Sequence, residues 1–330
     1  MAMKKGSILV LLAFFLLFGW PAQADQAPEE ILKAIVKIRS IIPGDAHTAR
    51  TLSTEREGYG VLIDAKGYIL TISYLILEAK TIEVVGPEGQ QISATFVGYD
   101  PDSGFGLLRA DKALNVEPMK LGDSSKANEG TPVLVAGYGG KESAMGAHVI
   151  TRTELTASWE YLLEDAIFTA PPYRNFGGAA LIGRDGRLLG IGSLLTQVTL
   201  QGTGPVPCNM FVPIDLLKPV LSDLMAIGRS SKPPRPWLGI SAHEARGRVM
   251  VDRVTSGGPA EQAGLQPGDF VLKVAGKEVD GLGGFYRKVW ALGPAGIDVP
   301  LSILRGTRME EITVRSADRY QFLLLKSKRI

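Results

Sequence analysis

Residues that perform acid–base, nucleophilic or metal chemistry are scarce in this sequence. It contains one cysteine, Cys208, and three histidines, His47, His148 and His243. These are too few for a zinc site of cysteine and histidine ligands, and a lone thiol cannot form an intramolecular disulfide. The sequence therefore predicts no metal site and no cofactor. We interpret Cys208 as a small buried residue just ahead of an apolar strand at 210–212.

The composition predicts a folded protein of about two domains. The chain has 330 residues, of which 45% are hydrophobic and 21% charged, the balance of an ordinary globular protein. At roughly 150 residues a domain, this length corresponds to two. Lysine and arginine number 36 against 34 acidic residues, and a net charge of +2 gives no basic surface for nucleic acid. We expect no nucleic-acid partner.

The N-terminus has the pattern of an export signal. Lys4 and Lys5 precede an apolar run at 8–20, and a small-residue cleavage site ends at Ala24. We predict a signal peptide at 1–24, cleaved after Ala24, and export, which in a bacterium means the periplasm. The apolar run is shorter than the roughly 20 residues of a membrane-spanning helix. An uncleaved signal that anchors the chain in the inner membrane is the alternative.

The chain from 31 to 227 is a series of short β-rich runs separated by Gly, Pro, Asp and Asn. Strands are expected at 34–38, 59–63, 68–72, 81–85, 93–99, 132–137 and 188–194. Short strands with turn residues about every 8–12 positions predict an all-β sandwich or barrel. One helix is expected at 215–227, between Pro213 and Gly228.

A polar, proline-rich stretch at 229–236 is typical of a linker between two domains. We therefore predict a first domain at 25–228, a second domain at 237–320 and a tail at 321–330. The second domain has a mixed pattern, with strands expected at 249–254, 270–274, 299–304 and 310–314 and helices at 259–263 and 284–292.

The second domain carries a long and specific motif. The segment at 258–272 resembles the signature of bacterial PDZ domains, and Trp237-Leu238-Gly239-Ile240 looks like their carboxylate-binding loop. The N–H groups of that loop hold the C-terminus of a peptide that adds itself as a β-strand. The resemblance implies a groove between this loop and the helix near 285–290. The peptide-binding residues that it implies are Trp237, Leu238, Gly239, Ile240, Arg287 and Trp290. Alternatively, Trp237 and Ile240 are core residues and the groove is occluded.

Motifs in the first domain resemble, in order and spacing, those of the HtrA/Deg serine proteases. The matching segments are 58–64, 67–71, 100–103, 107–108, 177–181 and 210–215. Members of that family are chymotrypsin-like double β-barrels followed by PDZ domains. The resemblance therefore implies a mainly β fold class, a trypsin-like double β-barrel followed by one α+β PDZ domain.

The three catalytic positions of that family do not match. The histidine position falls on Tyr74, the aspartate position on Gly104 and the serine position on Phe176. A triad needs a hydroxyl nucleophile, an imidazole that accepts its proton and a carboxylate that orients the imidazole. Phe176 offers no nucleophile, Gly104 offers no carboxylate, and a phenol with a reference pKa of about 10 is a poor base at neutral pH.

These residues suggest that the former active site is filled by packing. Arg174, beside Asn175, stands where the family has a glycine whose N–H lines the oxyanion hole, so we expect a misshapen hole. The missing side chain at Gly104 leaves space for Tyr74. Phe176 is then expected to contact the Tyr74 ring, with centroids about 4.5–7 Å apart.

Three functions follow as hypotheses. The preferred one is an exported pseudoprotease that binds polypeptide C-termini or exposed segments through its PDZ domain, in envelope protein quality control or as a regulator of an active HtrA-type protease. The second is a serine-type endopeptidase with a relocated active site, for which Ser73, Ser103 and Cys208 are the nucleophiles to test. The third is an oligomeric scaffold, which rests on the fold resemblance alone. Whether the chain is an enzyme stays open, and the missing triad favours that it is not.

Overall fold

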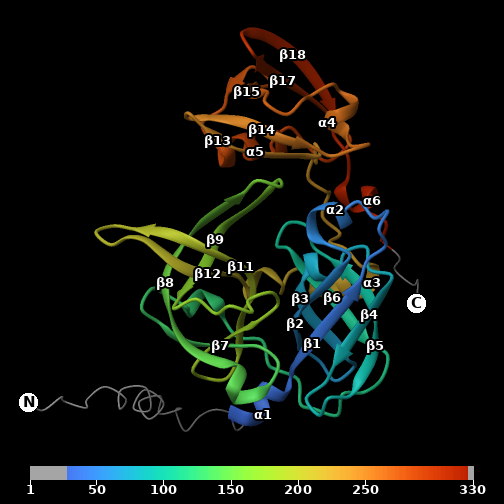
Figure 1. Ribbon diagram of the computed structural model, residues 1–330, viewed down its shortest axis with the longest axis vertical. Helices are drawn as coiled ribbons and strands as arrows, with labels where there is room; N and C mark the ends of the chain where they lie inside the picture. The colour runs from blue at the N-terminus through green and yellow to red at the C-terminus, as the bar shows by residue number, and fades with distance from the viewer. Residues whose placement is uncertain (1–27, 326–330) are drawn as a thin grey trace, which may run out of the picture.

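The computed structural model of the chain describes residues 28–325 (Figure 1). The predicted signal peptide at 1–24 and the end of the predicted tail, at 326–330, lie outside the described residues. None of the described helices is long and apolar enough to cross a lipid bilayer.

The first barrel consists of antiparallel strands in the order β1-β2-β3-β6-β5-β4, and β1 pairs with β4 to close it. The strands are β1 (Ile35–Ile41), β2 (Glu55–Leu62), β3 (Tyr68–Ile72), β4 (Thr81–Val85), β5 (Gln91–Tyr99) and β6 (Phe105–Ala110). They are rich in β-branched and aliphatic residues, and side chains such as Ile38, Leu70 and Leu107 are fully buried inside. Short helices α1 (Pro28–Lys33) and α2 (Ala49–Leu52) and the 3₁₀ turn η2 (Ser73–Leu75) accompany them.

The second barrel closes in the order β10-β11-β12-β9-β8-β7. Its elements are β7 (Pro132–Ala136), β8 (Ala144–Ala157), β9 (Tyr161–Ala170), β10 (Ala180–Ile182), β11 (Leu188–Leu200) and β12 (Gly204–Pro213), with the 3₁₀ turns η3 (Ser124–Lys126) and η4 (Gly140–Ser143). The β8–β9 hairpin rises from the barrel toward the C-terminal domain (Figure 1). This hairpin positions the residues that join the two domains.

The C-terminal domain is a sheet in the order β13-β14-β15-β17-β18, with β16 added to β15. Its elements are β13 (Ile240–Ala245), β14 (Arg248–Val254), α4 (Pro259–Gln262), β15 (Phe270–Val274), β16 (Lys277–Glu278), α5 (Leu282–Trp290), β17 (Asp298–Arg305) and β18 (Arg308–Arg315). The side chains of Phe285, Tyr286 and Val289 on α5 are buried in a core of this domain. The predicted fold class, two β-barrels followed by an α+β domain, is confirmed.

The predicted helix at 215–227 is wrong in its first half. Ile214–Leu216 forms a 3₁₀ turn, η5, and the α-helix α3 spans only Leu221–Ile227. Pro219 explains the break, because its ring has no N–H to donate and disfavours helical backbone at the preceding residue. Gly228 ends the helix in the left-handed conformation, with a φ of 76°.

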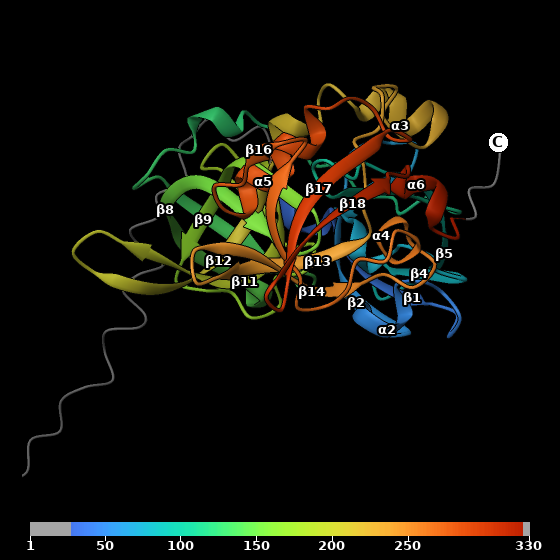
Figure 2. The same cartoon turned by 90° about the horizontal axis from the view of Figure 1, so that it is seen from above.

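After the last strand the chain returns to the first barrel. In α6 (Arg319–Phe322) the Tyr320 ring stacks on Tyr99 with centroids 5.3 Å apart. The centroid of the Phe322 ring lies 4.2 Å from that of the His47 ring and 4.6 Å from that of the Trp237 ring. Together with the linker, this segment holds the C-terminal domain over both barrels, as the view from above shows (Figure 2).

Candidate functional site

The sequence-predicted catalytic positions lie near the contact between the two barrels. Tyr74 is in η2 directly after β3, Gly104 is in the turn before β6, and Phe176 is in the loop before β10. A cleft of about 320 Å³ is lined by Glu57, Gly58, Tyr59, Tyr74, Leu75, Arg174, Asn175, Phe176 and Gly177. The structure therefore brings Tyr74, Phe176 and the two predicted oxyanion-loop residues to one cleft, and Gly104 is not part of its lining.

Tyr74 is held as a structural residue. Its hydroxyl donates a 2.9 Å hydrogen bond to the carbonyl oxygen of Ser193, and burial raises the pKa of its phenol well above the ordinary value. A buried phenol that keeps its proton and already donates it to a carbonyl cannot accept a proton from a nucleophile.

The space beside Gly104 is filled by Tyr161 and not, as predicted, by Tyr74. A Cβ at Gly104 would lie 3.2 Å from the Tyr161 hydroxyl, which donates a 2.6 Å hydrogen bond to the carbonyl oxygen of Ser103. The predicted ring contact of Tyr74 with Phe176 is not among the aromatic pairs found within residues 28–325. The space at Gly104 is taken by Tyr161 because β9, which is distant from Gly104 in the sequence, packs against the turn that carries it.

The other nucleophile candidates are buried. Ser73 and Ser103 are 8% and 3% exposed, and the Ser103 hydroxyl donates to the Asp100 carboxylate at 2.6 Å. Cys208 is fully buried, as predicted, and burial raises the pKa of its thiol to about 11. Within the described residues, no hydrogen bond joins a serine to a histidine ring, and no group of three or more His, Cys, Asp or Glu residues is placed to hold a metal ion.

The predicted carboxylate-binding loop of the C-terminal domain holds a carboxylate from the second barrel. Glu160, in the β8–β9 turn, accepts the N–H groups of Leu238, Gly239 and Ile240 at 2.8, 2.7 and 3.0 Å. Successive N–H groups that converge on one anion form a nest of positive partial charge. The loop therefore has the anion-binding geometry that the sequence predicts, and its ligand in this structure is Glu160.

Backbone groups of the same turn also form hydrogen bonds with the C-terminal domain. The N–H of Ala242, on the edge strand β13, donates to the carbonyl oxygen of Ser158 at 2.9 Å. The Tyr286 hydroxyl, on α5, lies 2.9 and 3.1 Å from the carbonyl oxygens of Ala157 and Ser158 and accepts the N–H of Glu160 at 3.2 Å. The turn thus contacts both walls of the predicted groove.

Burial and hydrogen bonding act in opposite directions on the pKa of the Glu160 carboxyl. Desolvation raises the pKa of the carboxyl, while the three N–H donors and the guanidinium of Arg319 act in the opposite direction, and burial is the larger effect. The turn also places Glu160 at a φ of 56°, a left-handed conformation that side chains other than glycine and asparagine rarely adopt. The three hydrogen bonds from the loop at 238–240 offset the unfavourable desolvation and backbone conformation of Glu160.

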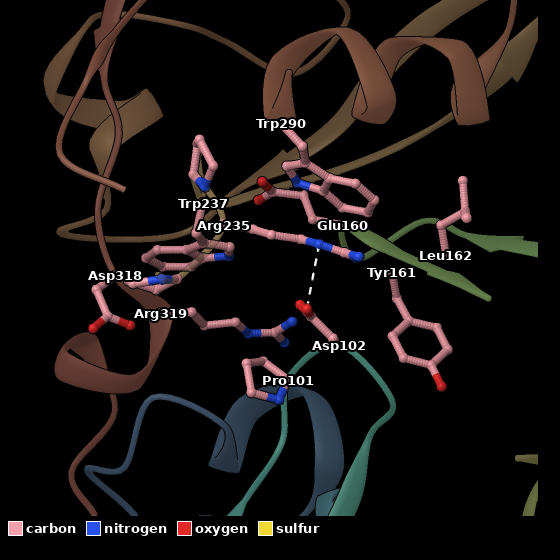
Figure 3. A pocket seen from close by; sticks show the side chains of 12 residues that line it. Pro101, Asp102, Glu160, Tyr161, Leu162, Arg235, Trp237, Trp290, Asp318 and Arg319 are labelled. Carbon is pink, nitrogen blue, oxygen red and sulfur yellow. Dashed lines mark ion pairs between the residues drawn. The ribbon is translucent and has the colours of Figure 1, made fainter. Parts of the chain in front are cut away.

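The remaining predicted peptide-binding residues surround this contact. Trp237 is 8% exposed, and a cavity of about 40 Å³ between the domains is lined by Glu160, Trp237, Trp290 and Arg235 among others (Figure 3). The Arg235 guanidinium lies 4.3 Å from the Trp290 ring centroid and 3.4 Å from the Asp102 carboxylate. Arg287 forms an ion pair with Glu154 of β8. Of the six predicted peptide-binding residues, Trp237, Leu238, Gly239 and Ile240 are buried, Trp290 is half-buried and Arg287 is exposed.

Sequence reasoning missed Glu160, Tyr161 and Tyr286. The one signal in the chain was a charged residue in a short turn between two strands, at a position where a glycine is common. Nothing in that pattern names the loop at 238–240 as its partner, because 78–80 residues separate the bonded groups.

Comparisons with known proteins agree with this architecture. A trypsin-like peptidase domain matches residues 58–191, and a PDZ domain matches residues 236–315. The chain is 29% identical over 279 residues to a probable periplasmic serine endoprotease DegP-like of Pseudomonas putida (strain W619), covering 78% of this chain and 55% of that protein. It is 24% identical over 332 residues to the periplasmic pH-dependent serine endoprotease DegQ of Escherichia coli (strain K12), covering 88% and 71%. The chain spans about half the length of most of these relatives.

Solved structures give the same fold. The HtrA-type protease AlgW with decapeptide has a TM-score of 0.54 and 21% identity, covering 91% of this chain and 99% of that one. The serine endoprotease from Yersinia pestis has a TM-score of 0.51 and 22% identity, covering 89% and 98%. With both domains matched, in this order, the chain belongs to the HtrA family of trypsin-like proteins that carry a C-terminal PDZ domain.

Proposed function

We propose that this chain is a pseudoprotease of the HtrA family that binds polypeptide C-termini through its PDZ domain. The absence of protease activity is supported by the residues at the three predicted catalytic positions. The Tyr74 hydroxyl is hydrogen-bonded to a backbone carbonyl, Tyr161 packs against Gly104, and Phe176 carries a phenyl ring. Triad residues act as a unit, and their loss lowers the rate by about a millionfold in a well-studied serine protease. The proposal therefore assigns the barrels a binding or scaffolding role.

A proteolysis assay tests the absence of catalysis. Purified protein is incubated with unfolded casein beside the variants Ser73→Ala, Ser103→Ala and Cys208→Ala. We expect no hydrolysis by any of the four proteins. Hydrolysis by the parent that one of these variants abolishes would mean that the chain is an endopeptidase with a relocated nucleophile. Hydrolysis that all four share equally is retested after further purification, and activity that still co-purifies with the protein would overturn the absence of catalysis.

The second half of the proposal rests on the loop at 238–240. Three converging N–H groups bind a carboxylate there, and the neighbouring edge strand donates to a carbonyl two residues earlier, which is how an extended peptide adds to a sheet. We expect peptides with a free C-terminus to bind and the same peptides with an amidated C-terminus to bind at least tenfold more weakly. Equal binding of the two forms would overturn C-terminal recognition.

The cellular setting is part of the proposal. The relatives DegP-like and DegQ are named as periplasmic. Together with the export pattern at 1–24, this supports export to the periplasm, and N-terminal sequencing of the secreted protein, expected to begin after Ala24, tests it. A role beside an active HtrA-type protease, and assembly into a homo-oligomer, are further parts of the proposal. Co-purification and light scattering of the mature protein measure them.

A further inference from the structure

The PDZ groove of this chain is already occupied by the chain itself. We propose that residues 158–162 act as an internal ligand that closes the groove, and that polypeptide C-termini ending in an aliphatic residue bind by displacing it. This inference rests on the proposed peptide-binding function and adds how the site is regulated and which chain ends it accepts.

The carboxylate of Glu160 takes the place of a peptide C-terminus. It is buried, and its two oxygens together accept three N–H groups of the loop at 238–240. Withdrawal of Glu160 without a replacement would leave those N–H groups without an acceptor, which is unfavourable in a site shielded from water. Another carboxylate satisfies them equally well.

The side chain of Leu162 takes the place of an aliphatic C-terminal residue. It belongs to the second barrel, yet it is 6% exposed and packs in the PDZ core together with Leu238, Phe285 and Val289. Leu162 lies in β9, two residues after Glu160 of the preceding turn, and both side chains are buried against the C-terminal domain: Leu162 in its core and Glu160 on the loop at 238–240. A C-terminal leucine carries a carboxylate and an aliphatic side chain on one residue, and it therefore matches the chemistry of this pair.

The backbone of the turn takes the place of the added strand. The Ser158 carbonyl accepts the N–H of Ala242 on the edge strand β13, two residues before the carboxylate. This contact is the kind that a peptide makes when it extends a sheet. The internal segment thus uses the loop, the apolar core and the strand edge at once.

The internal ligand is also a strained one. Glu160 has a φ of 56°, whereas the last residue of a free peptide has no such constraint. A free C-terminus competes with a segment that is present at high local concentration, so its apparent Kd is its intrinsic Kd divided by the open fraction. Any change that weakens the internal ligand should therefore tighten peptide binding.

The experiment measures peptide affinity in the full-length mature chain. The probe is a fluorescein-labelled peptide with residues 154–159 of this chain followed by leucine, ELTASWL, with a free or an amidated C-terminus. Fluorescence anisotropy compares the parent with Glu160→Ala, Glu160→Gln and the matched control Glu164→Gln, which makes the same charge change at an exposed residue of β9. We expect Glu160→Ala to bind the free peptide about tenfold or more tightly than the parent, Glu160→Gln to lie between them, and Glu164→Gln to equal the parent.

The outcomes separate this inference from the proposed function. Equal affinity of the parent and both Glu160 variants for the free peptide overturns the internal ligand and leaves C-terminal recognition standing. Binding by none of the four proteins, or equal binding of free and amidated peptide, overturns the proposed function and the inference with it. Binding by the Glu160 variants alone supports both.

A second measurement does not depend on a folded variant. Hydrogen exchange of the parent is followed with and without saturating peptide. We expect the amides of the turn at 158–160 to exchange faster when peptide is bound, while the amides at 238–240 keep their protection because one carboxylate replaces another. Unchanged exchange in the turn at saturation overturns displacement.

Discussion

The hydroxyl of Tyr161 donates a 2.6 Å hydrogen bond to the carbonyl oxygen of Ser103. It thereby ties β9 to the turn that carries Gly104, while the preceding residue, Glu160, enters the carboxylate loop of the PDZ domain. Adjacent residues of the β8–β9 hairpin therefore contact the turn that carries Gly104 and the loop at 238–240 of the PDZ domain. If a peptide displaced this hairpin, both the hydrogen bond of Tyr161 to Ser103 and the hydrogen bonds of Glu160 to the loop would be disturbed.

The first prediction concerns the crowding at Gly104. Its φ is 81°, and a Cβ there would lie 3.2 Å from the Tyr161 hydroxyl and 3.4 Å from Ile72. We expect Gly104→Ala to lower the free energy of unfolding by more than the roughly 1–2 kcal/mol that the left-handed backbone alone costs. Urea unfolding measures it.

The control for this change is Gly130→Ala. Gly130 has a φ of 80° and nothing within 4 Å of the added Cβ, so it shows the backbone effect alone. Equal destabilisation at both glycines would show that Tyr161 does not fill the position. In a Tyr161→Phe background we expect the excess cost at Gly104 to shrink, because the closest atom is removed.

The second prediction concerns Tyr74. Tyr74→Phe removes the hydrogen bond to the Ser193 carbonyl and leaves the ring in place, so we expect a loss of about 1 kcal/mol of stability. Tyr138→Phe, at a half-buried position whose hydroxyl forms no hydrogen bond with residues 28–325, should change stability by less. If Tyr74→Phe is neutral in a thermal melt, the proposed structural role of this hydroxyl is wrong.

The third prediction concerns the pH dependence of stability through Glu78. Its carboxylate accepts the N–H groups of His47, Thr48 and Leu324, which join the first barrel to the segment after α6. Burial raises the pKa of Glu78, but these bonds and the Thr48 hydroxyl outweigh it, and the pKa is lowered. A lowered pKa in the folded state gives stability that is present above the unfolded pKa and is lost as the pH falls through the folded value.

We therefore expect the urea midpoint of the parent to fall more steeply with acidification below about pH 5 than that of Glu78→Gln. The exposed Glu117→Gln should follow the parent. Parallel slopes for all three proteins would show that Glu78 does not contribute.

The fourth prediction concerns Cys208. Burial raises the pKa of its thiol to about 11 and removes it from solvent, so little thiolate is present or accessible at pH 8. We expect no reaction with a thiol reagent in the native protein and reaction of one equivalent after unfolding in guanidinium chloride. Rapid labelling of the native protein would mean that β12 opens locally or that the thiol is not buried.

Local pattern predicted most elements of this protein because the chemistry that forms them is local. Short β-rich runs bounded by turn residues predicted β3, β4 and β15 with their observed limits, and Gly228 ended α3 as expected. The helix predicted at 215–227 is absent from its first half because Pro219 interrupts it. The order of motifs also predicted two barrels and a PDZ domain.

What the sequence alone determined is which residues stand at each position of that framework, including Tyr74, Gly104 and Phe176 at the three positions that the family resemblance assigns to a triad. Only the tertiary structure decided what those residues contact. Tyr161 fills the space at Gly104, and Glu160 occupies the loop at 238–240, because the two barrels and the PDZ domain fold against one another and bring together groups far apart along the chain. Such contacts depend on shape and burial in three dimensions, and no periodicity or spacing in the sequence records them.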